Sequence, residues 1–351
     1  MRRLPTSTPM LLAIVTISAI LALRLSAAEP GNVYAVQNLV SDGSIPASHI
    51  DPMLVNAWGL AASSTSPWWV ADNGTNVSTL YDATGNPRPL IVNVPGAPTG
   101  TVFYGGAGFV VTGAGSARFI FAAEDGTISA WAPALGTQSK VVVPNASAPA
   151  HGAIYKGLAV ARTPSGDFLY AADFHNNHVD VFDAGFHPVP AAAFIDPGLP
   201  ARFAPFGIQT INGKIFVAYA KQDEDAEDEI AGDGLGFVSM FNTDGSFVAR
   251  VASRDALNAP WGMAMAPAHF GRFSDDLLVG NFGNGRINVF DGRTFEPKGH
   301  LKNTRGKAVV IDGLWGIGFG NGGAAGPVNV LYFAAGPHDE AAGLFGRIDA
   351  Q

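Results

Sequence analysis

The sequence contains no cysteine and few charged residues. None of the 351 residues is Cys, and Asp, Glu, Lys and Arg together make up only 14% of them. Without cysteine the protein has no disulfide, no thiolate nucleophile and no thiolate metal ligand. Its stability must therefore come from a buried core, and a chain of this length that is 47% hydrophobic can bury a large one.

Clusters of basic residues are also missing. The chain carries 21 Lys and Arg against 29 Asp and Glu, with no basic patch that contains interleaved aromatic residues. Six of the acids fall within residues 223–229, so the rest of the chain is close to neutral. This balance argues against a nucleic-acid partner and places the negative charge in one loop.

Long apolar runs are confined to the N-terminal region. Residues 10–23 follow two arginines and precede small residues, which is typical of a secretory signal. The run has about 14 residues, whereas a membrane-spanning helix needs about 20. We expect residues 1–28 to be removed and residues 29–351 to be secreted or periplasmic, with no membrane span after cleavage. Arg24, directly after the run, leaves an uncleaved anchor as the alternative.

Glycine and proline, in contrast, are abundant, with 43 and 24 residues. They separate short segments in which apolar residues alternate, a pattern typical of strands and turns rather than long helices. Residues 258–292 show it best: Trp261-Gly262-Met263 opens the unit, an apolar run follows at 277–281, and an alternating segment closes on Asp291-Gly292. The same order recurs along the chain, which indicates a repeat architecture.

Six such units can be assigned. The glycines near their starts are spaced roughly 40 to 57 residues apart, in the range of propeller blades, and are Gly59, Gly100, Gly157, Gly207, Gly262 and Gly316. The last unit has only three strands, whereas residues 33–40 form a predicted strand outside any unit. Pairing that strand with the last unit would close the ring. The sequence therefore predicts an all-β, six-bladed β-propeller formed as a single domain by residues 29–351.

Several short motifs also carry a resemblance to a known family. They include Asn56-Ala-Trp-Gly, Glu124-Asp-Gly-Thr-Ile, Tyr155-Lys-Gly-Leu-Ala, Ala259-Pro-Trp-Gly and Leu277-Leu-Val-Gly-Asn-Phe-Gly. With these motifs the chain resembles a family of exported bacterial six-bladed propellers with NHL-like repeats. The resemblance implies the fold for nearly the whole mature chain and no particular activity. More distant six-bladed propellers include calcium-dependent lactonases and lyases, a kinship of fold alone.

In a propeller, the loop that enters each innermost strand and the turn between the second and third strands open on the same face, here called the loop face. The first set of loops presents candidate ligand-binding aromatics: Trp58, Tyr155, Phe206, Trp261 and Trp315. The second set presents polar residues, among them Asp72, Asn73, Glu124, Asp125, Asp173, His175, His178, Asn281 and Glu340. Packing between blades and ordinary turn formation are the alternative explanations for these residues.

Oxygen ligands that converge at a channel mouth suit calcium. The candidate calcium ligands are Asp72, Glu124, Asp173 and Asn281, and the candidate catalytic bases are His175 and Asp125. His175 and His178 could instead hold a transition metal, although a spacing of three on a loop fixes no geometry.

The acidic segment, residues 223–233, begins like an EF-hand but lacks Gly at the sixth place and Glu at the twelfth. It is predicted to be either a solvated loop or a lid over the channel mouth.

Two functions remain open from the sequence. The first is binding of a small molecule, glycan or extracytoplasmic protein at the loop face, without chemistry, which the absence of a complete catalytic motif favours. The second is a calcium-assisted, lactonase-like hydrolase or a lyase with its metal in the central channel. Convergence of the four candidate oxygens on one point would favour the second.

Overall fold

The computed structural model describes Met1 and residues 31–145, 152–190 and 194–351. The predicted signal segment, Met1 apart, lies outside the described residues, so export stays a prediction. Among the residues that are described, no helix combines the length and the apolar character needed to cross a membrane.

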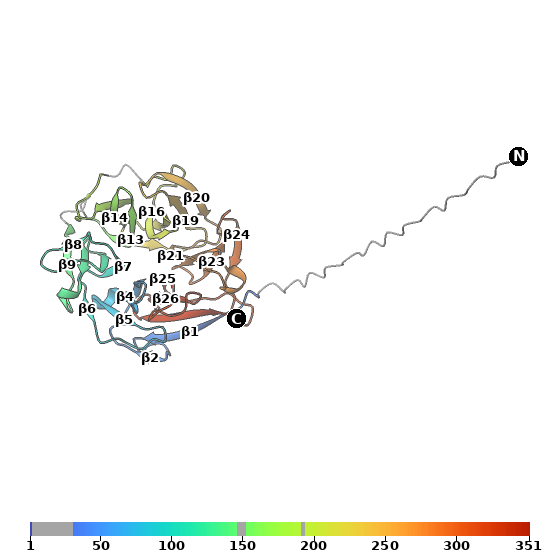
Figure 1. The fold of residues 1–351 in the computed structure, drawn as a ribbon, viewed down its shortest axis with the longest axis horizontal. Coiled ribbons are helices and arrows are strands. Elements are labelled where there is room, and N and C mark those ends of the chain that lie inside the picture. The colour runs from blue at the N-terminus through green and yellow to red at the C-terminus, as the bar shows by residue number, and fades with distance from the viewer. Residues whose placement is uncertain (2–30, 146–151, 191–193) are drawn as a thin grey trace. The chain divides into compact units, whose positions relative to one another are not determined.

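In the described residues, six mainly antiparallel sheets are arranged in a ring (Figure 1). The innermost strands are β3 (Ala57–Ala61), β7 (Pro98–Phe103), β13 (Tyr155–Thr163), β16 (Phe203–Ile211), β21 (Pro260–Met265) and β25 (Leu314–Phe319). Each of these strands contacts the next one around the ring, and β25 contacts β3. The unit Gly31–Gln351 is thus the predicted six-bladed propeller.

The strands outside the innermost ones complete the blades. The second strands are β4 (Trp68–Asp72), β10 (Phe119–Ala123), β14 (Gly166–Asp173), β17 (Lys214–Gln222), β22 (Leu277–Asn281) and β26 (Leu331–Ala335). The third strands are β5 (Val77–Tyr81), β11 (Ile128–Trp131), β15 (His178–Asp183), β19 (Gly236–Phe241), β23 (Ile287–Phe290) and β27 (Leu344–Ala350). The outermost strands are β6 (Val92–Asn93), β12 (Lys140–Val143), β20 (Phe247–Ser253), β24 (Pro297–His300) and β1 (Tyr34–Ser41).

Short elements occupy the connections. They are the strands β2 (His49–Ile50), β8 (Val110–Val111), β9 (Gly115–Ser116) and β18 (Glu229–Ile230), and the 3-10 turns η1 (Asn73–Thr75), η2 (Pro133–Leu135) and η4 (Gly271–Phe273). In the third blade, the described residues after β15 form only an isolated bridge between Phe182 and Pro188.

The N-terminal strand closes the ring, as predicted. β1 pairs antiparallel with β27, from Tyr34 opposite Ala350 to Ser41 opposite Leu344, with a bulge between Asn38 and Val40. The strand lies one residue later than the sequence pattern suggested. This pairing gives the last blade its fourth strand and covers an edge that would otherwise expose unpaired backbone groups.

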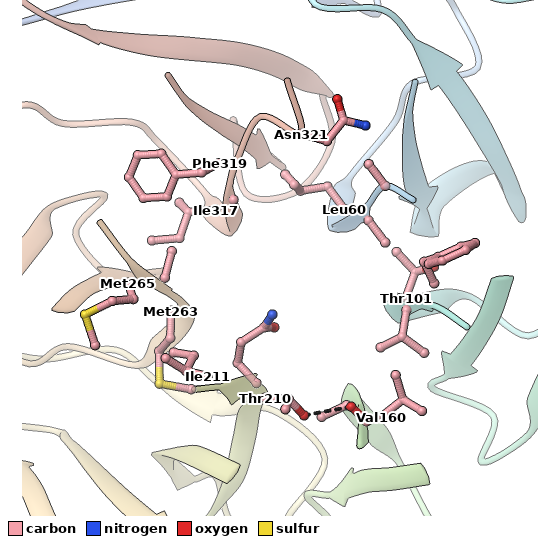
Figure 2. A pocket seen from close by; sticks show the side chains of 18 of the residues that line it. Leu60, Thr101, Val160, Thr210, Ile211, Met263, Met265, Ile317, Phe319 and Asn321 are labelled. Atoms are coloured by element: carbon pink, nitrogen blue, oxygen red, sulfur yellow. Dashed lines mark hydrogen bonds between the residues drawn. The ribbon is translucent and has the colours of Figure 1, made fainter. Parts of the chain in front are cut away.

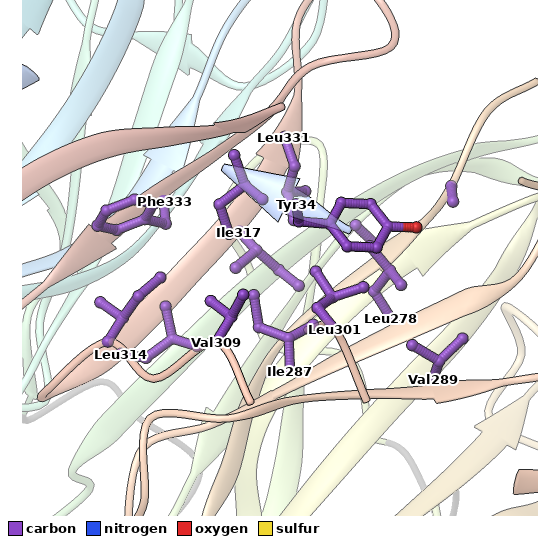
Figure 3. Close-up of a cluster of buried hydrophobic side chains, with 14 of the residues drawn as sticks. Tyr34, Leu278, Ile287, Val289, Leu301, Val309, Leu314, Ile317, Leu331 and Phe333 are labelled. Carbon is purple, nitrogen blue, oxygen red and sulfur yellow. The ribbon is translucent and has the colours of Figure 1, made fainter. Parts of the chain in front are cut away.

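The core lies between neighbouring blades. In the cluster of Figure 3, Leu278, Ile287 and Val289 of the fifth blade face side chains of the sixth blade. Tyr34 of β1 is fully buried in this cluster and donates a hydrogen bond from its hydroxyl to the Phe270 carbonyl at 3.1 Å. Each fully buried large apolar side chain contributes roughly 1.5–3 kcal/mol to stability. The strand pairing that closes the ring therefore also stabilises the core, because it buries Tyr34.

The repeated glycines let the innermost strands approach one another. A β-carbon on Gly207 would lie 2.1 Å from the Trp261 carbonyl oxygen of the next blade, and one on Gly100 would lie 2.3 Å from the Leu158 nitrogen. Both distances are far below normal contact, so a larger residue at these positions would push neighbouring blades apart. The aromatic residues beside these glycines are therefore held close to the channel axis.

Candidate functional site at the loop face

An aromatic cluster closes the channel at the loop face. This cluster, here called the aromatic plug, comprises Trp58, Phe174, Phe206, Trp261, Phe282 and Trp315. Trp58 stacks on Trp315 with ring centroids 3.6 Å apart and meets Trp261 edge-on at 6.2 Å. Trp58 belongs to the first blade and Trp261 to the fifth, which are not neighbours in the ring. Such a contact requires both rings to lie in the channel.

The plug buries most of the predicted ligand-binding aromatics. Trp58, Phe206 and Trp315 are at most 2% exposed, whereas Trp261 is partly exposed. Tyr155 is also fully buried, and its hydroxyl donates to Asp180 Oδ2 at 2.6 Å. Of the five, Trp261 is thus the residue with side-chain surface available to a ligand.

A charged network lies over the plug and is centred on Lys156, which is only 2% exposed. Its ammonium donates to Glu124 Oε1 at 2.5 Å and to Asp228 Oδ1 at 3.0 Å. The same ammonium lies 5.4 Å from the centre of the Trp58 ring, within range of a cation–π interaction. Lys156 therefore joins the aromatic plug to the carboxylates above it.

Two asparagines extend this network to further blades. Asn56 donates to Glu340 Oε2 at 2.5 Å and to Asn73 Oδ1 at 3.2 Å, and Asn73 donates to Glu124 Oε2 at 2.9 Å. Asn56 also accepts a hydrogen bond from the Trp315 indole at 3.2 Å. The charged network, defined as Asn56, Asn73, Glu124, Lys156, Asp228 and Glu340, thus draws on five of the six blades. It includes residues from both sets of loops, which therefore meet on one face.

Burial and mutual repulsion shift the pKa values of this region. Burial raises the pKa of Glu229 to about 8, despite the opposing attraction of Lys156. Burial also raises the pKa of Glu340, while its hydrogen bond from Asn56 opposes the shift. For Lys156, burial lowers the pKa, but the Glu124 and Asp228 carboxylates outweigh this effect and hold it above its usual value. Shifted carboxyl groups around a buried cation are typical of functional sites.

The acidic segment, residues 223–233, reaches over this network. Asp228 contacts Lys156, and β18 pairs with β17 to anchor the segment. On its other side, the Ala226 carbonyl lies 3.2 Å from His175 Nδ1. The segment is thus held by contacts on two sides, while the side chains of Glu224, Asp225 and Glu227 are exposed, so its role as a lid stays a prediction.

The four predicted calcium ligands have separate hydrogen-bond partners. Asp72 is fully buried and its Oδ2 accepts from the Thr79 amide at 2.9 Å, while burial raises its pKa well above the ordinary value. Asn281 donates to the Ala256 carbonyl at 2.7 Å. Glu124 belongs to the charged network and Asp173 to a group in the third blade. Calcium binding by all four together stays a prediction.

The predicted catalytic bases lie in turns. Asp125 is exposed and accepts hydrogen bonds from the Thr127 amide at 3.0 Å and the Thr127 hydroxyl at 2.6 Å, which stabilise a tight turn. His175 contacts the acidic segment, as described above. Neither is hydrogen-bonded to the residues of the charged network, so their catalytic roles also stay predictions.

The third blade brings Asp173 and His178 together with Asp180. His178 Nε2 lies 2.7 Å from Asp180 Oδ1 and 3.6 Å from Asp173 Oδ2. The hydrogen bond with Asp180 is the main cause that raises the pKa of His178 to about 9.

Asp180 and Lys156 were not among the residues singled out from the sequence. A signal existed for both: Asp180 follows His178 by two in a strand and so shares its face, and Lys156 interrupts an apolar strand start.

The opposite mouth of the channel is open. A cavity of about 510 Å³ lies there, lined by the C-terminal halves of the six innermost strands. Figure 2 shows apolar side chains such as Leu60, Ile317 and Phe319 around it, together with the polar side chains of Thr101 and Asn321. Thr210 donates to the Val160 carbonyl at 2.9 Å and ties the third and fourth blades together at this mouth (Figure 2).

Comparison with known proteins gives relatives without a described activity. The chain is 34% identical over 303 residues to "Uncharacterized protein L690" of Acanthamoeba polyphaga mimivirus, covering 81% of this chain and 78% of the relative. It is also 34% identical over 300 residues to "Uncharacterized protein R648" of the same virus, covering 81% and 73%. No protein-family model matches the chain. These relatives are viral, so they do not confirm the bacterial and exported origin that the resemblance implied.

Several solved structures of similar shape carry the names of enzymes. A streptogramin B lyase superposes with a TM-score of 0.54 at 13% identity, covering 91% of this chain and 97% of the lyase. The soluble aldose sugar dehydrogenase of Escherichia coli superposes with a TM-score of 0.56 at 15% identity, covering 91% and 100%. At such low identity the likeness shows the fold alone.

Proposed function

The chain belongs to the family of the mimivirus proteins L690 and R648, and we propose that it is a binding protein whose ligand lies at the loop face. The ligand would contact the charged network, the acidic segment and the exposed part of Trp261. The observation that supports this proposal is the buried ammonium of Lys156, held by carboxylates of two other blades above the aromatic plug.

Stability alone is a poor explanation for this arrangement. Burial of a lysine ammonium costs several kcal/mol, which ion pairing often only offsets. A turn can be made by residues of one blade, whereas this network requires six residues contributed by five blades. Charged groups assembled at such a cost are more common at binding sites than in structural cores.

The chemistry of the network favours a ligand with many hydrogen-bond donors. Glu124, Asp228 and Glu340 of the charged network supply acceptor oxygens, and Glu124 and Asp228 already accept hydrogen bonds from Lys156. The partly exposed Trp261 ring offers a flat apolar surface on which a sugar ring can stack. We therefore propose a glycan as the ligand class, bound without chemistry.

A printed glycan array tests the proposal, followed by calorimetry of the best-binding glycan. Glu340→Gln should weaken binding at least tenfold, because it removes a charged acceptor at the loop face. Gln209→Ala, which alters an exposed side chain at the opposite mouth, is the matched control and should bind like the wild type. Loss of affinity in Gln209→Ala alone would move the ligand to the 510 Å³ cavity and contradict the proposal.

A calcium-assisted hydrolase or lyase is the second candidate. The observation that favours it is that Asp72 Oδ1 and Asn281 Oδ1 are buried and have no hydrogen-bond partner among the described residues. A calcium ion bound to the native protein would raise its melting temperature, with about 2.7 kcal/mol of stabilisation at a hundredfold excess over Kd. A melt in EDTA and again with calcium restored tests this, and an unchanged melting temperature would remove the candidate.

A further inference from the structure

We propose that Asp173, His178 and Asp180 form a site for a divalent transition-metal ion of the zinc class, in the third blade. One ligand atom from each residue lies within 4.8 Å of the other two. The site is separate from the charged network, and the proposal does not depend on glycan binding at the loop face.

The distances fit a tetrahedral ion with a small adjustment. Ligand atoms at about 2.0–2.2 Å from a tetrahedral zinc ion lie about 3.4 Å from one another. His178 Nε2 is 3.6 Å from Asp173 Oδ2, which needs almost no change. The 2.7 Å contact between His178 Nε2 and Asp180 Oδ1 must widen by less than about 1 Å. His178 begins β15 and its side chain is 37% exposed, so it has room to move.

Outer contacts orient each ligand. His178 Nδ1 lies 3.2 Å from the Asn176 carbonyl, which accepts a hydrogen bond from Nδ1–H and leaves Nε2 directed at the carboxylates. Asp180 is held through Oδ2 by the Tyr155 hydroxyl at 2.6 Å, which leaves Oδ1 for an ion. Asp173 accepts hydrogen bonds from the Asn176 backbone N–H at Oδ1, 3.1 Å away, and from the Asn176 side-chain amide at Oδ2, 2.9 Å away. Such support is what fixes histidine and carboxylate ligands in known metal sites.

Charge also favours an ion here. The Asp173 and Asp180 side chains are 0% and 2% exposed, and His178 is their only partner within ion-pair distance among the described residues. Two buried carboxylates beside one histidine favour a cation between them. A divalent ion supplies that positive charge. Calcium is disfavoured because it takes six to eight oxygen ligands, whereas this group offers a nitrogen and two carboxylates.

Space for a fourth ligand adjoins the group. A cavity of about 370 Å³ is bordered by His178, Asp180 and the 188–190 segment. Three protein ligands and an accessible fourth position are typical of zinc sites that bind water or a substrate.

The test uses the full chain without a histidine tag, titrated with Zn²⁺ by calorimetry and with Co²⁺ by visible absorption. We expect one ion per chain and the strong visible bands of tetrahedral Co²⁺. His178→Gln should weaken binding at least tenfold, while His175→Gln, three residues earlier and outside the group, should bind like the wild type. Zn²⁺ should raise the melting temperature of the wild type and His175→Gln, but not that of His178→Gln.

Three outcomes would overturn the proposal: no ion bound by the folded wild type, equal binding by His178→Gln, or binding lost in Asp228→Asn but kept in His178→Gln. The last would place the ion at the acidic segment. If His178→Gln fails to fold, Asp180→Asn takes its place, since an amide oxygen can still accept from Tyr155. Unweakened Zn²⁺ binding by Asp180→Asn would contradict the site in the same way.

Discussion

The two mouths of the channel are built from opposite ends of the same six strands, yet they differ in almost every respect. At the loop face, the innermost strands are pinched together at glycines and the plug fills the space between them. At the opposite mouth, side chains such as Leu60 and Met265 surround an open cavity of about 510 Å³. The comparison shows that an open cavity and a concentration of charged groups need not coincide, and that the charged mouth is the closed one.

The largest expected difference between the mouths is in packing. Trp315 is fully buried between Trp58 and Phe282, whose ring centroids lie 3.6 and 4.0 Å away. Trp315→Ala should lower the free energy of unfolding by about 3–5 kcal/mol because it empties the centre of the plug. Urea unfolding measures the change. Phe319→Ala, which removes a half-buried ring at the opposite mouth, is the control, and an equal loss in both variants would contradict the comparison.

The next effect concerns the charged network. Glu124→Gln should lower the free energy of unfolding by about 1–3 kcal/mol, because it leaves the buried Lys156 with only the exposed Asp228 as a charged partner. Asp125→Asn changes the exposed neighbouring carboxylate and should stay within about 0.5 kcal/mol of the wild type. Equal stabilities of the two variants in urea would show that the ion pair between Lys156 and Glu124 does not stabilise the folded protein.

Stability should also depend on pH through Glu229, which lies in the acidic segment near Lys156 of the charged network. The pKa of Glu229 is about 8 in the folded protein against 4.5 ordinarily, owing first to burial and then to the nearby Glu340 and Asp228, with Lys156 opposing. Below pH 4.5 both the folded and unfolded states hold the proton. Between pH 4.5 and 8 the unfolded state releases it first, so the free energy of unfolding should fall as pH rises.

Denaturation at several pH values, compared between the wild type and Glu229→Gln, isolates this contribution. The variant should lose less stability over the window from pH 4.5 to 8. Parallel curves would mean that Glu229 ionises in the folded protein as it does in the unfolded chain.

The smallest effect is expected at the open mouth. Thr210→Val removes the hydrogen bond to the Val160 carbonyl and should cost about 0.5–1.5 kcal/mol. Thermal unfolding of Thr210→Val beside Thr210→Ser, which keeps the hydroxyl, checks this. A loss of stability as large as that of Trp315→Ala would contradict the expectation that the loop face contributes more to stability than the open mouth.

The fold was predictable because similar sequence units repeat along the chain at a regular spacing. Most blades begin with an aromatic-Gly pair such as Trp261-Gly262. The N-terminal strand, which belonged to no unit, could complete the last blade, which had only three strands. The site was predictable only in part. The sequence placed Trp58 and Trp315 at strand starts, but whether their rings face a ligand or each other depends on the channel width, which is set by contacts between distant blades.

Lys156 illustrates the same limit. Its partners Glu124 and Asp228 lie 32 and 72 residues away in the chain, so no local pattern announces the ion pairs. Asp180 lies within a strand, and its pairing with His178 becomes meaningful only once Asp173, on the neighbouring strand, is placed beside it.

Hydrogen–deuterium exchange with and without the best-binding glycan tests the central claim most directly, because it maps the ligand without altering any residue. The account predicts slower exchange in the acidic segment, residues 223–233, and around Glu340, where the ligand would hold the loops over the plug. Slower exchange confined to residues 209–212 and 317–321 would place the ligand in the open cavity and contradict the claim that the loop face is the binding site.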